Sequence, residues 1–273
     1  MQVVSFLARD GMTIYGYLTL PVKLGPRKLP MVLDVHGGPW VRDVWHLDPE
    51  VQWLANRGYA VLQINFRGSS GYGKAYLDAG DREWGGKMHT DLIDGKNWAV
   101  KAGYADPKKI CIMGASYGGY AVLSALAFTP DEFACGVDFG GPSNLVTFLN
   151  NIPPGSPIKA QFTKRIGDVD TQEQSLELRS PLFKADQIIA PLLIAQSAND
   201  IRVKQIESDQ IVAAMRKKGL QVEYIVFPNE GHNLEQIDNS LKFYAAAEVF
   251  LAKCLGGRSE VPSDEENVDE LLR

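Results

Sequence analysis

The chain has 273 residues, of which 45% are hydrophobic and 22% are charged; this is an ordinary globular composition, and the length suffices for one large α/β domain. The formal net charge is −5 at pH 7 and no basic block is present, which argues against a nucleic-acid or anionic-membrane partner. The N-terminus "MQVVSFLARDG" has no basic region before an apolar stretch, and no apolar run reaches the length of a membrane span. We therefore expect a soluble, cytoplasmic protein, and the sequence leaves a homo-oligomer open.

The chain has three cysteines, Cys111, Cys135 and Cys254. A disulfide framework needs more cysteines and an even number of them. Two of them lie in apolar strand-like runs, where a free thiol packs as a small hydrophobic group. We expect free thiols and a reducing compartment. No histidine or cysteine pair has zinc-site spacing, so we expect neither a metal nor a cofactor.

The order of predicted elements indicates an α/β fold. Two β-rich runs, 2–7 and 12–20, flank Asp10-Gly11 and predict an antiparallel hairpin. Further strands are expected at 31–36, 59–66, 109–113, 134–139, 191–196 and 222–227. Helices are expected near 50–57, 90–101, 117–128, 205–218 and 241–255. This alternation predicts a mostly parallel central sheet with helices on both faces.

Two stretches depart from this alternation. Between about 140 and 190 the periodicity weakens, and we expect an inserted, cap-like region over the crevice at the carboxyl ends of the strands. Residues 258–273 are acidic and nearly free of aromatics, which predicts a mobile tail. The expected organisation is one catalytic domain over 1–257 followed by this tail.

A serine lies between glycines where a strand is expected to meet a helix. Residues 114–119, "GASYGG", follow the apolar run 110–113, and the apolar helix after them ends at Thr129-Pro130. With 26 glycines the chain can contain Gly-x-Ser-x-Gly by chance, so the strand before it and the helix after it carry the argument. In this context the motif predicts a nucleophile elbow, with Ser116 at the tip of a strained turn.

A nucleophilic serine needs a general base and a group that orients the base. Of the four histidines only His232 follows Ser116, so it is the predicted base in the order serine, acid, histidine. Asp200 is the predicted acid because it follows the apolar run that ends at Gln196. Asp138 is an alternative at the end of another strand, and Glu230 is too close to His232 in sequence to orient it easily.

The tetrahedral intermediate needs two hydrogen-bond donors for its oxyanion. The first is expected to be the backbone N–H of Tyr117, directly after the nucleophile. The second is expected from the segment "HGGPW", residues 36–40, where Gly38 is the preferred donor. The alternative for these glycines is that they only form a turn.

Residues 68–74, "GSSGYGK", match the Gly-x-x-x-x-Gly-Lys pattern of a phosphate-binding loop. The next residue is Ala75, so the hydroxyl that would hold Mg²⁺ is absent, and no later strand offers an obvious second metal ligand. We therefore reject a nucleotide site.

Five motifs together, "HGGPW", "NFRGSSGYG", "GASYGGY", "NDIRV" and "EGH", resemble the catalytic domain of the prolyl oligopeptidase family of serine peptidases, in particular its acylaminoacyl-peptidase-like branch. The resemblance covers roughly 1–257 and implies an α/β-hydrolase fold with Ser116, Asp200 and His232 as the triad. It also implies that Arg202, two residues after the acid, holds a substrate carbonyl; a surface role for this arginine is the alternative.

The sequence also departs from this family. Ala195-Gln196 stands where many members have His-Gly, and Asn233-Leu234 stands where they have Gly-Phe after the histidine. The N-terminal β-propeller of the family is absent from this sequence, which indicates either a separated catalytic domain or a stand-alone hydrolase.

Three functions are weighed. The first is a serine hydrolase that cleaves short peptides or acylated amino acids through an acyl-enzyme, and the second is a carboxylesterase for small acyl or aryl esters. The third is a non-catalytic binding domain, which would have lost a triad member, and none is lost. Trp40, Trp45, Tyr72 and Tyr117 are candidates for an apolar pocket, with core packing as their alternative. Of these, Trp40 is the expected substrate-binding residue.

Overall fold

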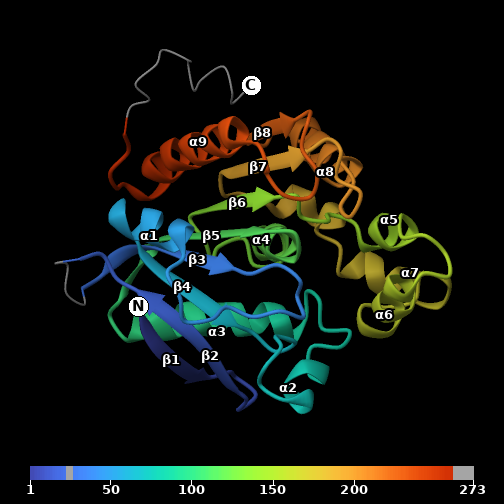
Figure 1. Cartoon of the computed structure of the whole chain (residues 1–273), viewed down its shortest axis with the longest axis horizontal. Coiled ribbons are helices and arrows are strands. Elements are labelled where there is room, and N and C mark those ends of the chain that lie inside the picture. Colours follow the sequence, from blue (N-terminus) through green and yellow to red (C-terminus); the bar gives the residue numbers. More distant parts are fainter. Residues whose placement is uncertain (23–26, 261–273) are drawn as a thin grey trace.

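The computed structural model describes residues 1–22 and 27–260, and within them one mixed eight-stranded sheet forms the middle layer (Figure 1). The strands are β1 (Gln2–Leu7), β2 (Thr13–Thr19), β3 (Leu29–Val35), β4 (Ala60–Asn65), β5 (Ala105–Ala115), β6 (Cys135–Phe139), β7 (Leu192–Ser197) and β8 (Val222–Phe227). Their order across the sheet is β1-β2-β4-β3-β5-β6-β7-β8. The pairs β1–β2 and β2–β4 are antiparallel and the others are parallel, which confirms the predicted fold class.

Helices cover both faces of this sheet. They are α1 (Pro49–Asn56), α2 (Lys74–Asp78), α3 (Lys87–Lys101), α4 (Tyr117–Phe128), α5 (Leu145–Asn150), α6 (Pro157–Arg165), α7 (Val169–Leu178), the 3₁₀ segment η1 (Pro181–Gln187), α8 (Ile206–Lys217) and α9 (Ile237–Leu255). The expected helices occur, with α3 and α9 beginning earlier than the sequence indicates. The short helix α2 was not expected, because it has only five residues.

Two apolar clusters, one on each face, hold the layers together. Alternation along β3 sends Leu33 into the cluster with α3, α4 and α8, and Val32 into the cluster with α1 and α9. Helix α4 is buried along almost its whole length, as its apolar sequence predicts. The parallel strands are apolar on both sides because helices cover both faces of the sheet.

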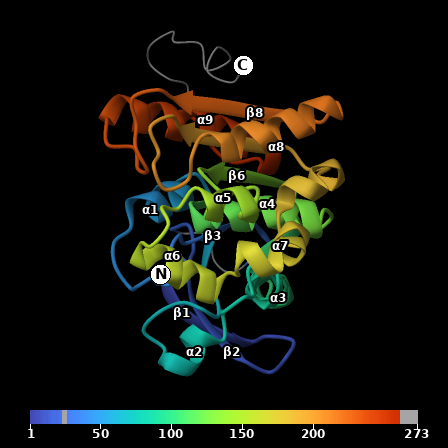
Figure 2. The ribbon, with the colours of Figure 1, turned by 90° about the vertical axis from the view of Figure 1, so that its right-hand side faces the viewer.

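The 140–190 region contains α5, α6, α7 and η1. In Figure 1 helices α5 to α7 lie beyond the arrowheads of the parallel strands, and Figure 2 shows them in front of the sheet when that side faces the viewer. Asn144 caps α5 by accepting from the Val146 N–H at 3.0 Å. The insert therefore stands at the carboxyl edge of the sheet.

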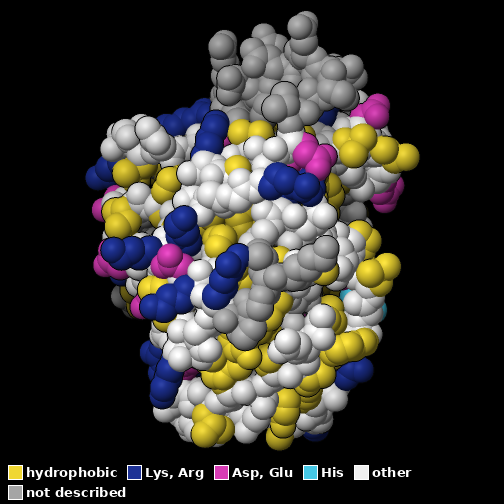
Figure 3. All heavy atoms as spheres, turned by 90° about the vertical axis from the view of Figure 1, so that its left-hand side faces the viewer, with side chains coloured by type: hydrophobic (Ala, Val, Ile, Leu, Met, Phe, Trp, Pro, Cys, Tyr) yellow, Lys and Arg dark blue, Asp and Glu magenta, His cyan; other side chains and the backbone are white. Residues whose placement is uncertain are grey.

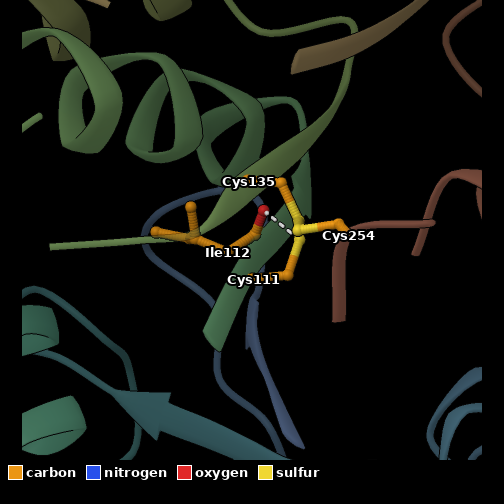
Figure 4. Close-up of a disulfide and its surroundings, with 4 residues drawn as sticks. All are labelled: Cys111, Ile112, Cys135 and Cys254. Atoms are coloured by element: carbon orange, nitrogen blue, oxygen red, sulfur yellow. Dashed lines mark hydrogen bonds between the residues drawn. A yellow bond between two sulfur atoms is a disulfide. The ribbon is translucent and has the colours of Figure 1, made fainter. Parts of the chain in front are cut away.

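The prediction of free thiols is wrong for two of the three cysteines. Cys135 at the start of β6 and Cys254 near the end of α9 form a disulfide across 119 residues of sequence, and Cys111 is the buried free thiol beside it (Figure 4). Cys111 faces Cys135 in the parallel register of β5 and β6. The sequence hides this proximity because it arises only when α9 packs back over the sheet.

The C-terminal end of the described chain lies against α1 and α9. The Arg258 N–H donates to the Arg57 carbonyl at 3.0 Å, and Arg57 pairs with Glu248 at 2.7 Å. Most of the predicted tail, residues 261–273, lies outside the described residues. The domain boundary at 257 stays a prediction.

Exposed apolar side chains gather on the N-terminal hairpin. Val3 and Leu7 of β1 are 68% and 69% exposed. Figure 3 shows hydrophobic side chains gathered in the lower half of the face that lies at the left of Figure 1, at the height of β1 and β2. Within the described part of the chain, no helix has the length and apolar character needed to cross a bilayer.

Candidate active site

Ser116 lies in a strained turn between β5 and α4. Its φ is 58° and its ψ −117°, and Arg82 is the other non-glycine residue with positive φ among the described residues. The turn is held because the Ser116 N–H donates to the Phe139 carbonyl of β6 at 2.9 Å. The strained turn thus places the half-buried Ser116 at the carboxyl edge of the sheet.

The glycines on either side of Ser116 are required by the approach of β3. A Cβ at Gly118 would lie 2.0 Å from the Val35 carbonyl oxygen, and one at Gly114 would lie 2.6 Å from the same atom. No side chain fits at either position without moving a backbone of the central sheet.

Asp200 and His232 are brought together by the loops after β7 and β8. Asp200 Oδ2 lies 2.7 Å from His232 Nδ1, while Asp200 Oδ1 accepts from the N–H groups of Arg202 at 2.7 Å and Val203 at 3.0 Å. A backbone bond from Asn199 N–H to the Glu230 carbonyl at 3.0 Å ties the two loops. A carboxylate that accepts from Nδ1–H leaves Nε2 of the neutral ring as a proton acceptor.

The two alternative acids lie in other environments. Glu230 accepts from Glu235 N–H and Gln236 N–H at 3.0 Å each and from Asn239 Nδ2 at 2.7 Å, so it stabilises the beginning of α9. Asp138 is buried beneath α4 and accepts from Gly141 N–H at 2.8 Å. Burial raises the pKa of Asp138 to about 7. Neither carboxyl is hydrogen-bonded to His232, whereas Asp200 is.

The loop with Gly38 passes close to the nucleophile. Gly38 has a φ of +107° and precedes Pro39 through a cis peptide bond, and a Cβ at Gly37 would lie 3.1 Å from the Ala115 carbonyl. Tyr117 begins α4, so its N–H belongs to the first turn, where backbone donors have no partner within the helix. Both expected oxyanion donors therefore lie at the same edge as Ser116.

His36 and Ser69 support this loop and were missed as a pair by sequence reasoning. His36 Nδ1 lies 2.8 Å from the Gly37 carbonyl and Nε2 lies 2.9 Å from Ser69 Oγ, with the ring stacked on Phe66. Burial lowers the pKa of His36 to about 4, so the ring is neutral. The "GSSGYGK" segment, in which no nucleotide site was expected, thus contributes Ser69 to the loop.

A cavity of about 1380 Å³ contains both Ser116 and His232 in its lining. Its apolar side is lined by Trp40, Trp84, Tyr117, Phe148, Ile152 and Phe162. Trp40 packs edge-on against Phe162 of α6, with ring centroids 5.1 Å apart. The insert therefore provides part of the pocket. Trp40 is one of the lining residues, whereas Trp45 and Tyr72 are not.

Arg202 also lines the cavity. Its side chain is exposed and its guanidinium has no ion-pair partner in the described part of the chain, so it is available to a ligand. Its backbone N–H, in contrast, is used to hold Asp200. No three His, Cys, Asp or Glu side chains of residues 1–22 and 27–260 are grouped to hold a metal ion.

Comparisons with known proteins identify the family of the chain. A family model described as the prolyl oligopeptidase family matches residues 45–258. The chain is 53% identical over 267 residues to dipeptidyl aminopeptidase BIII of Pseudoxanthomonas mexicana, covering 94% of this chain and 39% of that protein. The chain thus spans about two fifths of this relative's length.

Two solved structures have the same fold. A Mycobacterium tuberculosis puromycin-hydrolyzing peptidase superposes with a TM-score of 0.90 at 28% identity, covering 95% of this chain and 40% of that one. A Pyrococcus horikoshii acylaminoacyl peptidase superposes with a TM-score of 0.87 at 26% identity, covering 100% of this chain and 44% of that one. On the strength of the matched family model and the similar relatives, the chain belongs to the prolyl oligopeptidase family.

Proposed function

We propose that this chain is the catalytic part of a serine peptidase that cleaves short peptides or acylated amino acids through an acyl-enzyme. The observation that carries the proposal is the 2.7 Å contact of His232 Nδ1 with Asp200 Oδ2, in a cavity that also contains the strained Ser116. Membership of the prolyl oligopeptidase family supports it, as do relatives named dipeptidyl aminopeptidase and acylaminoacyl peptidase.

The proposed reaction proceeds in two acyl-transfer steps. His232 Nε2 accepts the Ser116 proton as Oγ attacks the substrate carbonyl carbon, and Asp200 stabilises the imidazolium that forms. The N–H groups of Gly38 and Tyr117 donate to the oxyanion. His232 then protonates the leaving amine as the bond to carbon breaks. Water, deprotonated by the same histidine, releases the acyl group and restores Ser116.

Substrate positioning is proposed for Arg202 and Trp40. A guanidinium has a rigid set of N–H donors that can hold a peptide carbonyl on the acyl side of the scissile bond. Trp40, packed on the cap helix α6, would contact an apolar side chain of the substrate. We propose residues 1–257 as the catalytic domain and 140–190 as its cap.

A carboxylesterase is the second candidate, because ester and amide hydrolysis use the same triad. The cavity volume of about 1380 Å³ accommodates either class of substrate. The two reactions differ in the leaving group, since an amine must be protonated by His232 and an activated phenolate needs no proton.

The experiment compares p-nitrophenyl esters with aminoacyl and peptidyl p-nitroanilides in the wild type, Ser116→Ala and a control, Ser124→Ala, from the same helix. Ser116→Ala should lower kcat by about 10³-fold or more and abolish fluorophosphonate labelling. The control should retain both. Ester turnover with no measurable anilide turnover would favour the esterase, and labelling of Ser116→Ala would refute the assigned nucleophile.

The compartment and the assembly remain proposals. The sequence favours the cytoplasm, whereas the disulfide between Cys135 and Cys254 favours an oxidising compartment. Counting alkylatable thiols in protein taken from cells distinguishes the two. For a homo-oligomer, the exposed hairpin face around Val3 and Leu7 is the surface to test by sedimentation of Leu7→Glu.

A further inference from the structure

One side of the catalytic cavity is acidic. Four carboxyl residues line it, and we call them the acidic wall: Asp34, Asp43, Asp48 and Glu50. Asp34 belongs to β3, Asp43 and Asp48 to the loop after it, and Glu50 to the first turn of α1. The same cavity contains Ser116, so a ligand attached to the serine can reach toward this wall.

The acidic wall has no lysine or arginine to balance it among the described residues. Asp34 accepts from Gln63 Nε2 at 3.2 Å and Glu50 from the Tyr244 hydroxyl at 2.8 Å, both neutral donors. Asp43 Oδ2 is buried with no hydrogen-bond partner. His46 lies beside the wall, with its Nε2 3.8 Å from Asp48 Oδ2.

The carboxyls also interact with one another. Burial first, and then repulsion from Glu50, Asp43 and Asp48, raises the pKa of Asp34 well above its usual range. Burial and Asp48 raise the pKa of Asp43 to about 7. Burial also raises the pKa of Glu50. Such a group of acids weakens the folded state unless a cation joins it.

The surroundings of the wall fit a long side chain with a charged end. Phe243 and Tyr244 of α9 line the cavity together with Phe139, and the rings of Phe139 and Phe243 have centroids 5.4 Å apart. Aromatic walls accommodate the methylene stem of lysine or arginine, while the carboxyls bind its charged end.

The acidic wall lies on the leaving-group side of the scissile bond. His232 must protonate the leaving amine, so the leaving group lies close to His232. The next residues, Asn233 and Leu234, line the cavity between His232 and α9. The lining lysine and arginine, Lys204 and Arg202, lie on the loop after β7, where Lys204 Nζ donates to Asn151 beside the cap helices. The cavity is therefore polarised, with its cations near the cap and its carboxyls near α1 and α9.

We propose that the acidic wall is a leaving-group subsite that selects peptides with lysine or arginine on the C-terminal side of the cleaved bond. This rests on the proposed peptidase function. The acyl part of the substrate lies toward Arg202, and the departing peptide places its basic side chain between Asp34 and Glu50. The bound cation compensates the carboxyls that the fold leaves without one.

The test uses substrate pairs with one acyl part and leaving peptides that differ in one residue, lysine against norleucine and arginine against citrulline. In the wild type, kcat/KM should favour the charged member by on the order of tenfold, as expected for a hydrogen-bonded charge. The ratio should fall toward one in Asp34→Asn and in Glu50→Gln. The control Glu173→Gln, on the exposed face of α7, should keep the wild-type ratio.

A second measurement separates this proposal from the proposed function. Lysine and norleucine peptides are compared as competitive inhibitors of p-nitrophenyl acetate hydrolysis. The inhibition constants measure peptide binding in the cavity without any peptide cleavage. Tighter inhibition by the lysine peptide, lost in both variants, supports the subsite even if no peptide is cleaved. Equal kcat/KM values and equal inhibition within both pairs in the wild type would overturn it, as would a preference unchanged in both variants.

Discussion

Reducing the disulfide between Cys135 and Cys254 should destabilise the protein measurably. The bridge joins the start of β6 to the end of α9 across 119 residues, and loop-closure entropy for such a separation amounts to about 5 kcal/mol at 25 °C. Unfolding entropy of about 2.1 cal/mol/K per residue converts this, for 273 residues, into a fall in Tm of roughly 8 to 9 °C. The value is an upper bound, because residual structure in the unfolded chain lowers it.

The assay is thermal unfolding with and without a phosphine reductant, together with thiol counting by alkylation and mass spectrometry. Unreduced, unfolded protein should react at one cysteine, Cys111, and reduced protein at three. Cys254→Ala should already have the lower Tm and should not respond to reductant, whereas Cys111→Ala should respond as the wild type does. Three reactive thiols before reduction, or an equal response of Cys254→Ala and wild type, would refute the reasoning.

Three further predictions concern single residues. Arg202→Ala should weaken transition-state binding, as calculated from kcat/KM, by about 1 to 3 kcal/mol more for peptidyl p-nitroanilides than for p-nitrophenyl acetate. Equal losses on both substrates would make its role structural. Gly38→Ala, at a φ of +107° where a Cβ would lie 2.9 Å from Trp40 N, should displace the backbone N–H of residue 38 and slow ester and anilide hydrolysis alike by about tenfold or more; unchanged rates would show that oxyanion binding does not need a glycine here. The pKa of Asp138 is raised by burial to about 7, above the unfolded value of about 3.9, so the wild type loses stability as pH rises through this window. The stability of Asp138→Asn relative to wild type in urea unfolding should therefore increase from pH 4 to 7, and parallel pH profiles would contradict this.

The residues proposed for the triad could be named from the sequence because each follows a strand that the apolar pattern identifies. Ser116 follows β5, Asp200 follows β7 and His232 follows β8. The carboxyl ends of parallel strands meet at one edge of the sheet, so order along the chain becomes proximity in space. The pattern also gave the hairpin and most helices within a few residues.

What the sequence could not predict depends on contacts between distant segments. The disulfide needs α9 to cross the sheet, and no local pattern at Cys135 or Cys254 records that crossing. The acidic wall combines a strand residue, two loop residues and a helix residue, each of which alone looks like a capping or surface acid. Asp48 does cap α1, accepting from Glu50 N–H at 2.9 Å, and its local role conceals its place in the cavity.

The acidic wall and the apolar side of the cavity belong to different kinds of secondary structure. We expect this difference to affect how each side selects its part of the substrate. Asp34 lies within β3, paired with Gln63 of β4 and Met113 of β5, and Glu50 is fixed to α9 through Tyr244. A charged site on such elements is preorganised, because its carboxyls cannot move apart to relieve their repulsion. The apolar side instead depends on Phe148 and Phe162 of short cap helices. Adaptation to different acyl groups is thus expected from the cap, and strict discrimination by charge from the sheet.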